Sequence, residues 1–518
     1  MKKTMKQHSF TSRLKSLALA FGITLAFASC ANEEIAQNSN GKDYDVSLTT
    51  FSTGDPATRT SMESNGTFYW ESGDKIWVKD DNGAWQQSSN APTEKTAYFK
   101  FKVPGKFTKD NTYKVYYPGK NGNQDQVSIV ANQSQAEPNT TAHFGTAGDC
   151  GMADAAWSNA KNGFAFTLDH KAAYLLFLPR TSNTILQGCY LTKVEVNSDN
   201  DITSTYTLNP TTGELTGTGT GKQIIVSTGG SGTYANGFPL SAATNGAYVV
   251  IKPGTHILKI RYWLKDVATG IEGTITKTLP SATYDQNKYY NITANLDVRV
   301  YDGDHYYMWD AQEQYWKGHE WSLGGSQPTL SQGLTGATTS NDYAKSNADS
   351  RYYNESFTYG ADNKATHTSC KDLPNVNEMT WYVAKGEPRW DADELWTTMG
   401  RLYKGGMWFK KKANISGYNP NTAVDGNDWR TDIVSGNIGS ISYTLPSAAD
   451  AGNYFYLPAL GAYVSGQLHN VGNVGRYWLS SAPTRYRNNA YILYFGSGIL
   501  FVGATDRTTG LWAEALFE

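Results

Sequence analysis

The chain has 518 residues, and its 45 Lys and Arg residues against 47 Asp and Glu residues leave a formal net charge of −2. This balance gives no basic surface of the kind that nucleic-acid-binding proteins carry, so no nucleic-acid partner is expected. The 50 Gly, 34 Tyr and 15 Trp residues are typical of a β-rich chain with many loops, and the length allows several domains.

Residues 1–29 have the pattern of an export signal peptide. Basic residues between Lys2 and Lys15 precede an apolar run, Leu17–Phe27, that is too short to span a bilayer. Two small residues then lead to Cys30. This order resembles a bacterial lipobox, in which cleavage occurs just before the Cys and its thiol carries a diacylglyceryl group. An ordinary signal peptide followed by a chance Cys is the alternative.

Residues 30–44 are polar and have no apolar period, so we expect a lipidated, flexible tether. Glu33 and Glu34, just after the Cys, resemble the surface-export signal of Bacteroidetes-type lipoproteins. That resemblance implies a surface-exposed lipoprotein of the cell outer membrane. No other apolar run reaches the ~18 residues of a membrane-spanning helix, so the lipid is the expected membrane attachment.

Short strands separated by Gly, Pro and Asn turns are predicted from residue 45 to residue 298. In Leu258–Leu264, for example, apolar side chains alternate with Lys259 and Arg261. The same alternation occurs in Phe99–Val103, Tyr113–Tyr117, Phe164–Leu168 and Tyr290–Leu296. Without helical periods between them, such strands predict two tandem β-sandwiches, over residues 45–155 and 156–298.

Three segments of this part resemble Bacteroidales fimbrillin-like proteins. They are Thr58–Thr60 followed by Phe68–Val78, then Phe166–Ala173, and then Asn287–Thr293, and the resemblance covers roughly residues 45–298. It implies transthyretin-like β-sandwich domains that assemble into pili by strand exchange with other fimbrial subunits. A sandwich that lacks one strand exposes unpaired backbone groups, which another chain can fill.

In that family a trypsin-like protease cuts after an Arg near the N-terminus and releases the strand that fills the groove. The matching position is Arg59, with the cut before Thr60, downstream of a candidate strand over Val46–Phe51. The alternative is an ordinary solvated Arg at a strand end, and anchor subunits of the family keep this strand uncut.

Residues 299–518 differ in composition, since ten of the 15 Trp residues fall there. Asp391–Met399 is the best helix candidate after Cys30, because Asp391 can cap its start and Leu395, Trp396 and Met399 share a helical face. Tyr454–Gly461, spaced Gly residues and Tyr477–Ser481 follow. This pattern resembles the Fibrobacter-type major paralogous domain, which implies a C-type-lectin-like α+β fold.

A metal site and an enzymatic activity are not expected. Glu387-Pro388-Arg389 places a cation where a calcium-dependent lectin has an Asn carbonyl. The eight His residues show no metal-binding spacing, and His367 near Cys370 is not enough for a nucleophile pair. No cofactor is expected either. A disulfide between Cys150 and Cys189 stays open.

The polar stretch Arg485–Asn489 is the best candidate for a binding surface. Sugar sites combine flat aromatic surfaces with amide and charged groups, so the candidate ligand-binding residues are Trp478, Tyr486, Arg487 and Asn488. The interpretation with most support is a lipid-anchored fimbrial tip or accessory adhesin that binds a host or mucus glycan or protein. A stand-alone surface glycan-binding lipoprotein that does not polymerise is the alternative. The strand expected within Leu511–Phe517 favours a tip over a stalk subunit.

Overall fold

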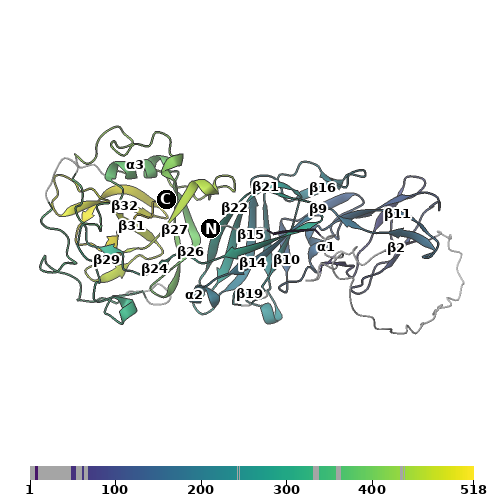
Figure 1. Ribbon diagram of the computed structural model, residues 1–518, viewed down its shortest axis with the longest axis horizontal. Coiled ribbons are helices and arrows are strands. Elements are labelled where there is room, and N and C mark those ends of the chain that lie inside the picture. The colour runs from purple at the N-terminus through teal and green to yellow at the C-terminus, as the bar shows by residue number, and fades with distance from the viewer. Residues whose placement is uncertain are drawn as a thin grey trace, which may run out of the picture.

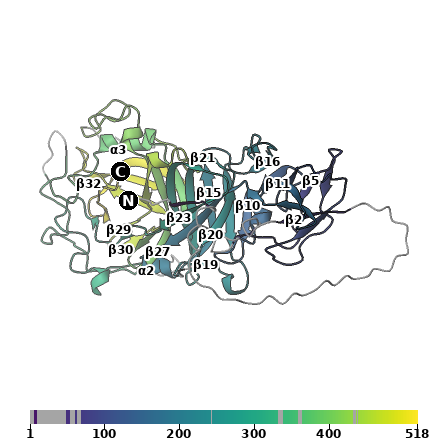
Figure 2. The ribbon, with the colours of Figure 1, turned by 45° about the vertical axis from the view of Figure 1, so that its right-hand side comes forward.

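The computed structural model describes residues 6–9, 48–53, 61–62, 68–241, 243, 245–330, 338–357, 363–431, 436 and 438–517. Strands dominate these residues and form three successive parts of an elongated molecule, purple, teal and green to yellow in Figure 1. The turned view separates the same parts (Figure 2). The prediction of a mainly β chain is confirmed.

The N-terminal part is a sheet with the strand order β6-β5-β8-β11-β12-β2-β7. β11 pairs with β8 at one end and with β12 at the other, so it joins two halves of the sheet over a common aromatic core. The elements are β2 (Thr49–Thr53), β3 (Ser61–Met62), β4 (Phe68–Tyr69), β5 (Trp77–Lys79), β6 (Trp85–Gln87), β7 (Lys100–Val103), β8 (Tyr113–Tyr117), β11 (Gly151–Ser158), β12 (Gly163–Phe166) and β13 (Asp169–His170).

The second part is a sandwich of two sheets, β23-β14-β20 and β10-β18-β15-β21-β22, around a large apolar core. β1 (Lys6–Ser9), inside the predicted signal peptide, pairs with β23. The other elements are β9 (Gln126–Ile129), β10 (Asn132–Gln135), α1 (Phe144–Ala147), β14 (Ala173–Arg180), α2 (Thr184–Gln187), β15 (Tyr190–Ser198), β16 (Ser204–Leu208), β17 (Leu215–Thr216), β18 (Gln223–Thr228), β19 (Phe238–Pro239), β20 (Ala247–Ile251), β21 (Gly254–Lys265), β22 (Glu272–Tyr284) and β23 (Lys288–Asn295).

The boundary predicted between residues 155 and 156 falls inside β11, and both ends of this strand pair within the N-terminal sheet. The Asn159–Asn162 turn connects the neighbouring strands β11 and β12. Conversely, β9 and β10 precede β11 in the chain but pair with β16 and β18 of the second part. The chain therefore crosses between the two parts more than once.

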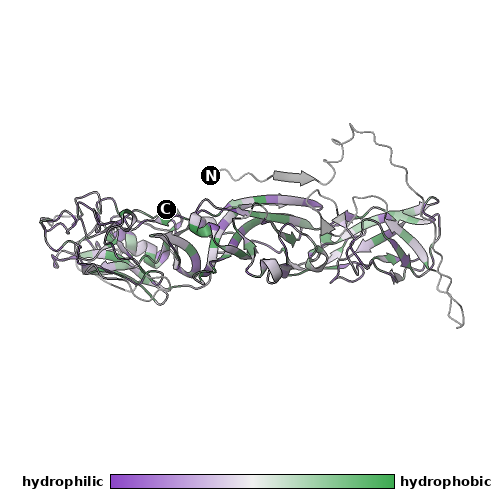
Figure 3. Ribbon diagram, turned by 90° about the horizontal axis from the view of Figure 1, so that it is seen from below, coloured by the Kyte–Doolittle hydropathy of each residue, from purple (hydrophilic) through white to green (hydrophobic). Residues whose placement is uncertain are grey.

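The C-terminal part, here called the C-terminal module, contains the strands β26-β27-β28 and a sheet of order β25-β34-β31-β32-β33. Helix α3 contacts β27, β32 and β33. The elements are β24 (Val300–Tyr301), β25 (Tyr306–Tyr307), α3 (Val376–Lys385), β26 (Arg389–Thr398), β27 (Arg401–Lys410), β28 (Tyr454–Pro458), β29 (Ala462–Val464), β30 (Gln467–His469), β31 (Val474–Trp478), β32 (Asn489–Gly496), β33 (Ile499–Asp506) and β34 (Leu511–Trp512). Hydrophobic strands run through all three parts (Figure 3).

The helix predicted over Asp391–Met399 is wrong, because Asp391–Thr398 belong to strand β26 and Met399 lies in the turn that follows it. β26 is buried along most of its length, and its pairing with β27 shifts register between Asp391 and Leu395. A strand covered on both faces loses the two-residue alternation, so the pattern of apolar residues imitated a helix. The helix of the module is α3, which Asn375 and Glu378 cap reciprocally.

The second sandwich and the C-terminal module share one continuous sheet, because β26 pairs in parallel with β22 at Thr274 and Glu394. β22 and β26 are neighbours in Figure 1. We call this contact the C-terminal junction, and the contact between the first two parts the N-terminal junction.

Candidate functional site

Strand β2 lies upstream of Arg59 in the chain and in the interior of the N-terminal sheet. It runs parallel to β12, with Phe51 opposite Phe164, and antiparallel to β7, with Phe51 opposite Phe101. Both edges of β2 are therefore hydrogen-bonded to neighbouring strands. The predicted strand Val46–Phe51 overlaps β2 by three residues, Thr49–Phe51.

Phe51 anchors β2 in the core. Its side chain is fully buried, stacks on Phe164 with 5.0 Å between ring centroids, and meets Phe107 edge-on at 5.1 Å. At the end of the strand, Phe99 N donates to Thr53 Oγ1 at 3.1 Å, and Lys161 Nζ donates to Thr53 O at 2.9 Å. The sheet thus holds β2 by backbone pairing, by one buried ring and by polar contacts at its end.

Loss of β2 would leave unpaired backbone groups along β7 and β12, beside a groove that the ring of Phe51 had filled. Such a groove is a template for an extended segment of another chain. The predicted processing residues Arg59 and Thr60, like the lipidation residue Cys30, lie outside the described residues.

The predicted ligand-binding residues of the C-terminal module differ in solvent exposure. Tyr486 is 58% exposed, and Arg487 and Asn488 are also exposed, on the loop that leads into β32. The loop is a tight turn, in which Asn489 N donates to Tyr486 O at 3.0 Å, and Arg507 N donates to Asn488 O at 2.8 Å.

The prediction that Trp478 binds the ligand is wrong, because its side chain is not accessible. It is fully buried at the end of β31, and its Nε1 donates to Tyr307 O at 2.7 Å. The sequence showed an aromatic residue near a polar loop, but not that its ring faces the core. Trp478 is therefore part of a core cluster of the module and offers no face to a ligand.

The Glu387-Pro388-Arg389 segment, which differs from a calcium-dependent lectin site, has structural contacts. Glu387 accepts hydrogen bonds from Lys410, from Arg389 Nη2 at 3.0 Å and from Tyr454 OH at 2.9 Å. These contacts, that of Lys410 first, lower the pKa of Glu387 to about 2. Within the described ranges, no group of three or more His, Cys, Asp or Glu side chains is placed to hold a metal ion.

Cys150, Cys189 and Cys370 are buried free thiols, so the disulfide between Cys150 and Cys189 that the sequence left open is not formed. Burial raises the pKa of Cys189 and of Cys370 to about 12, which opposes a thiolate. His367 Nδ1 contacts the carbonyl oxygen of Asp310 at 2.6 Å. Among the described residues, no helix is long and apolar enough to cross a membrane.

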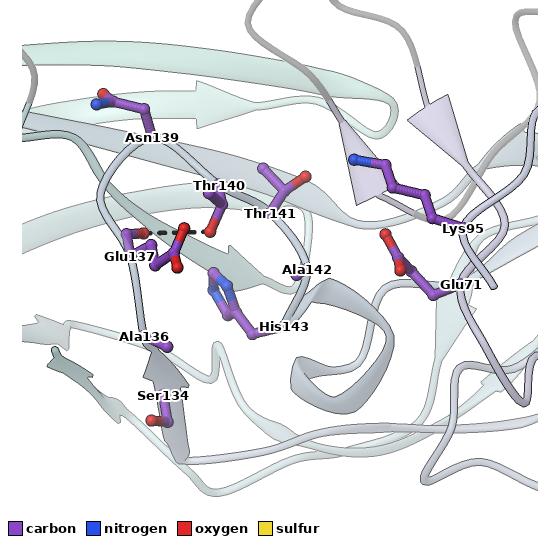
Figure 4. Close-up of a pocket in the computed structure, with 10 residues that line it drawn as sticks. All are labelled: Glu71, Lys95, Ser134, Ala136, Glu137, Asn139, Thr140, Thr141, Ala142 and His143. Atoms are coloured by element: carbon purple, nitrogen blue, oxygen red, sulfur yellow. Dashed lines mark hydrogen bonds between the residues drawn. The ribbon is translucent and has the colours of Figure 1, made fainter. Parts of the chain in front are cut away.

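A cavity that sequence reasoning missed lies at the N-terminal junction (Figure 4). It measures about 560 Å³, and Glu71 and Lys95 face the loop between β10 and α1 across it. His143 on this loop donates through Nε2 to Tyr248 O at 3.1 Å, and burial lowers its pKa to about 4. Eight of the ten lining residues lie between Ser134 and His143, but Glu71 and Lys95 come from an earlier part of the chain, so spacing in the sequence could not reveal the cavity.

Comparisons with known proteins give only distant likenesses. No model of a known protein family matches the chain, and no curated protein matches it. A candidate cell adhesion protein from Bacteroides ovatus is 16% identical over 48% of this chain and 93% of its own, with a TM-score of 0.32. A fimbrial assembly protein from Parabacteroides distasonis is 10% identical over 48% of this chain and 90% of its own, with a TM-score of 0.23.

A fimbrial protein from Bacteroides ovatus is 11% identical, and the alignment covers 89% of this chain and 97% of that protein, with a TM-score of 0.23. Likenesses at this level carry no argument about fold or function. The function of this chain therefore has to be inferred from its own residues and contacts.

Proposed function

We propose that this chain is a lipid-anchored fimbrial tip or accessory adhesin that is assembled by strand exchange. The observation that carries the proposal is the position of β2, inside a sheet and upstream of Arg59. A cut after Arg59 would separate β2 from the rest of the chain while all other strands of the N-terminal sheet stay covalently connected. The groove would then accept a strand from a neighbouring fimbrial subunit.

The contacts of β34 support a tip or accessory position rather than a stalk. β34 lies between β25 and β31, and Leu511 and Trp512 are almost fully buried. Phe517, 9% exposed, packs against Tyr382 and Phe455. These residues are part of the module's own core and are not available as a donor strand.

The test of assembly is the N-terminal sequence of the protein in a purified pilus fraction. We expect the chain to begin at Thr60 and the Arg59→Ala variant to be absent from pili. Arg180→Ala, at the last residue of β14, is the matched control for loss of an Arg and should leave processing unchanged. Protein that begins at Cys30 in pili would reject strand exchange and favour an anchor subunit, whereas protein absent from pili would favour the stand-alone lipoprotein.

We place ligand binding on the C-terminal module, with Tyr486, Arg487 and Asn488 as contact residues for a host or mucus glycan or protein. The double substitution Tyr486→Ala/Arg487→Ala should weaken adhesion to mucin-coated surfaces and leave the melting temperature unchanged, because these side chains are exposed. Tyr443→Ala, at another exposed Tyr of the module, serves as the control. Equal adhesion of the double variant and the parent chain would remove this loop from the binding surface.

A further inference from the structure

A second cavity, of about 260 Å³, lies at the C-terminal junction. One wall comes from β21 and β22 and includes Lys259, Arg261 and Thr276; the other includes Asp391 of β26 and Trp408 of β27. Small-molecule sites are often found between domains, and their volumes start at about 300 Å³. A cavity of this size suits a single ring better than an extended chain.

The lining carries more positive than negative charge, with Lys259, Arg261 and Lys411 against Asp391. The Asp391 carboxylate is already occupied. Arg261 Nη2 donates to its two oxygens at 2.9 and 3.1 Å, and Trp408 Nε1 donates to Oδ2 at 3.1 Å. Arg261 is therefore neutralised within the cavity, and the charges of Lys259 and Lys411 remain.

Lys259 is the unusual member of this lining. It is 7% exposed, its ammonium donates to the carbonyl oxygen of Pro446, and it has no ion pair in the part of the chain that the structure describes. The nearby carboxylates have other partners: Glu394 accepts from Thr276 N at 2.8 Å, and Glu195 accepts from Trp263 Nε1 at 3.3 Å. A buried ammonium is costly unless an anion compensates it, so Lys259 has capacity for an anionic ligand.

The guanidinium of Arg261 gives a second, independent sign of capacity. Arg261 is only 6% exposed, and its buried Nε has no hydrogen-bond acceptor among the described residues. Buried donors are normally paired, and an unpaired one marks a place where a missing acceptor fits.

Trp408 supplies an aromatic surface to the same cavity. It is half-buried, its Nε1 is held by Asp391, and its ring packs against Tyr456 with 5.0 Å between centroids. An indole fixed in this way is preorganised to stack on the C–H face of a sugar ring, at little entropic cost.

We propose that the cavity binds a sugar ring that carries a carboxylate group. The ring lies against Trp408, and the carboxylate accepts hydrogen bonds from Lys259 and Lys411. The inference rests on the proposed adhesin function, and it names the ligand class: acidic glycans. Because β21 and β27 both contribute to the cavity, the bound sugar connects the second sandwich to the C-terminal module.

The test is a calorimetric titration of the full chain with glucuronate. Glucose tests the need for the charge, and glutamate tests the need for the ring. Glucuronate should bind, and both comparison compounds should bind at least about tenfold more weakly, as expected for loss of a charge-assisted hydrogen bond or of the stacked ring. Lys259→Met and Lys411→Met should each weaken glucuronate binding by about tenfold or more. Lys265→Met, on the same strand as Lys259 but outside the cavity, should change it less than twofold.

Three outcomes would overturn the proposal. They are no binding of glucuronate at millimolar concentration, equal binding of glutamate, which would assign the cavity to acidic peptides, and unchanged binding in both lysine variants. If Lys259→Met does not fold, Lys411→Met at the partly exposed position decides. Adhesion and pilus incorporation are measured separately. A chain that binds glucuronate here but neither adheres nor enters pili would keep this inference and reject the proposed function.

Discussion

The two junctions of this molecule each bury an aspartate, but they compensate it differently. At the N-terminal junction, Asp149 accepts hydrogen bonds from the Tyr174 hydroxyl and from His170 Nδ1 at 3.0 Å. At the C-terminal junction, Asp391 forms an ion pair with the buried Arg261 at 2.9 Å. Loss of a buried charged partner leaves an uncompensated ion, whereas loss of a hydroxyl leaves a weaker hydrogen-bond network. The C-terminal junction should therefore be the more sensitive to substitution.

The largest effect is expected for Asp391→Ala. The variant would leave Arg261 buried without its carboxylate, so the free energy of unfolding should fall by about 3–5 kcal/mol. Urea-induced unfolding followed by Trp fluorescence measures this loss. Asp393→Ala is the control, because Asp393 and its partner Lys404 are 35% and 42% exposed, and it should cost at most about 1 kcal/mol. Similar losses in the two variants would contradict the expected contribution of the Arg261–Asp391 ion pair to stability.

Glu394 at the C-terminal junction should make stability depend on pH. Burial, and then the charge of Asp391, raises its pKa from 4.5 to about 7. The folded state then binds a proton more readily than the unfolded state, so this contribution is complete below pH 4.5 and is lost as the pH rises through about 7. The loss between pH 5 and pH 8 should be about 2–3 kcal/mol.

Glu394→Gln tests this slope, because the amide does not titrate. Melting temperatures of the variant should fall less than those of the parent chain between pH 5 and pH 8. Glu387→Gln is the matched control. The pKa of Glu387 is lowered to about 2, so Glu387 is mostly ionised in both the folded and the unfolded protein between pH 5 and pH 8, and it adds little to the slope. An unchanged slope in Glu394→Gln would show that other groups set it.

At the N-terminal junction, Tyr174→Phe should lower the free energy of unfolding by about 1–3 kcal/mol, because buried Asp149 loses a hydrogen-bond donor. Tyr262→Phe is the control, since the Tyr262 hydroxyl is buried without a hydrogen-bond partner among the described residues. Removal of that hydroxyl should be nearly neutral or stabilising. Equal losses in the two variants would mean that volume, not the contact with Asp149, determines the effect.

His143 should give the smallest effect, and of opposite sign to Glu394. Burial lowers its pKa from 6.5 to about 4, so the stability it contributes is complete above pH 6.5 and is lost as the pH falls through about 4. Because the side chain is partly exposed, the loss between pH 7 and pH 5 should be about 1 kcal/mol. In His143→Gln this acid-side loss should shrink, whereas His305→Gln, at an exposed His, should retain it. Equal slopes in both variants would mean that His143 does not cause the loss of stability at acid pH.

Strands with one covered face could be predicted from the sequence. The alternation of Phe99–Val103 became β7, where Phe101 and Val103 are buried and Lys100 is exposed. β26 could not be predicted in this way, because it is covered on both faces and its ladder shifts register. Helix α3 had a readable signal: Asn375 and Glu378 have capping-box spacing, and Val376, Met379 and Val383 share a face.

The candidate sites were also only partly predictable from the sequence. The exposed loop at Tyr486 was predicted because polar residues without periodicity favour loops. The burial of Trp478 could not be, since an aromatic residue at a strand end can face the core or solvent. Neither cavity was predicted, because each joins residues from separate parts of the chain, such as Lys259 and Trp408.

The shared sheet at the C-terminal junction also bears on solubility. β22, at 13 residues, has β21 on one side and meets β26 on the other, where Glu394 also accepts from the backbone of Thr276 at 2.8 Å. Long strand edges without a neighbour recruit other chains and promote aggregation. The C-terminal module therefore covers an aggregation-prone strand edge of the second sandwich. A chain shortened after Asp297 would expose that edge, and we expect it to self-associate in a concentration-dependent manner, which light scattering would detect.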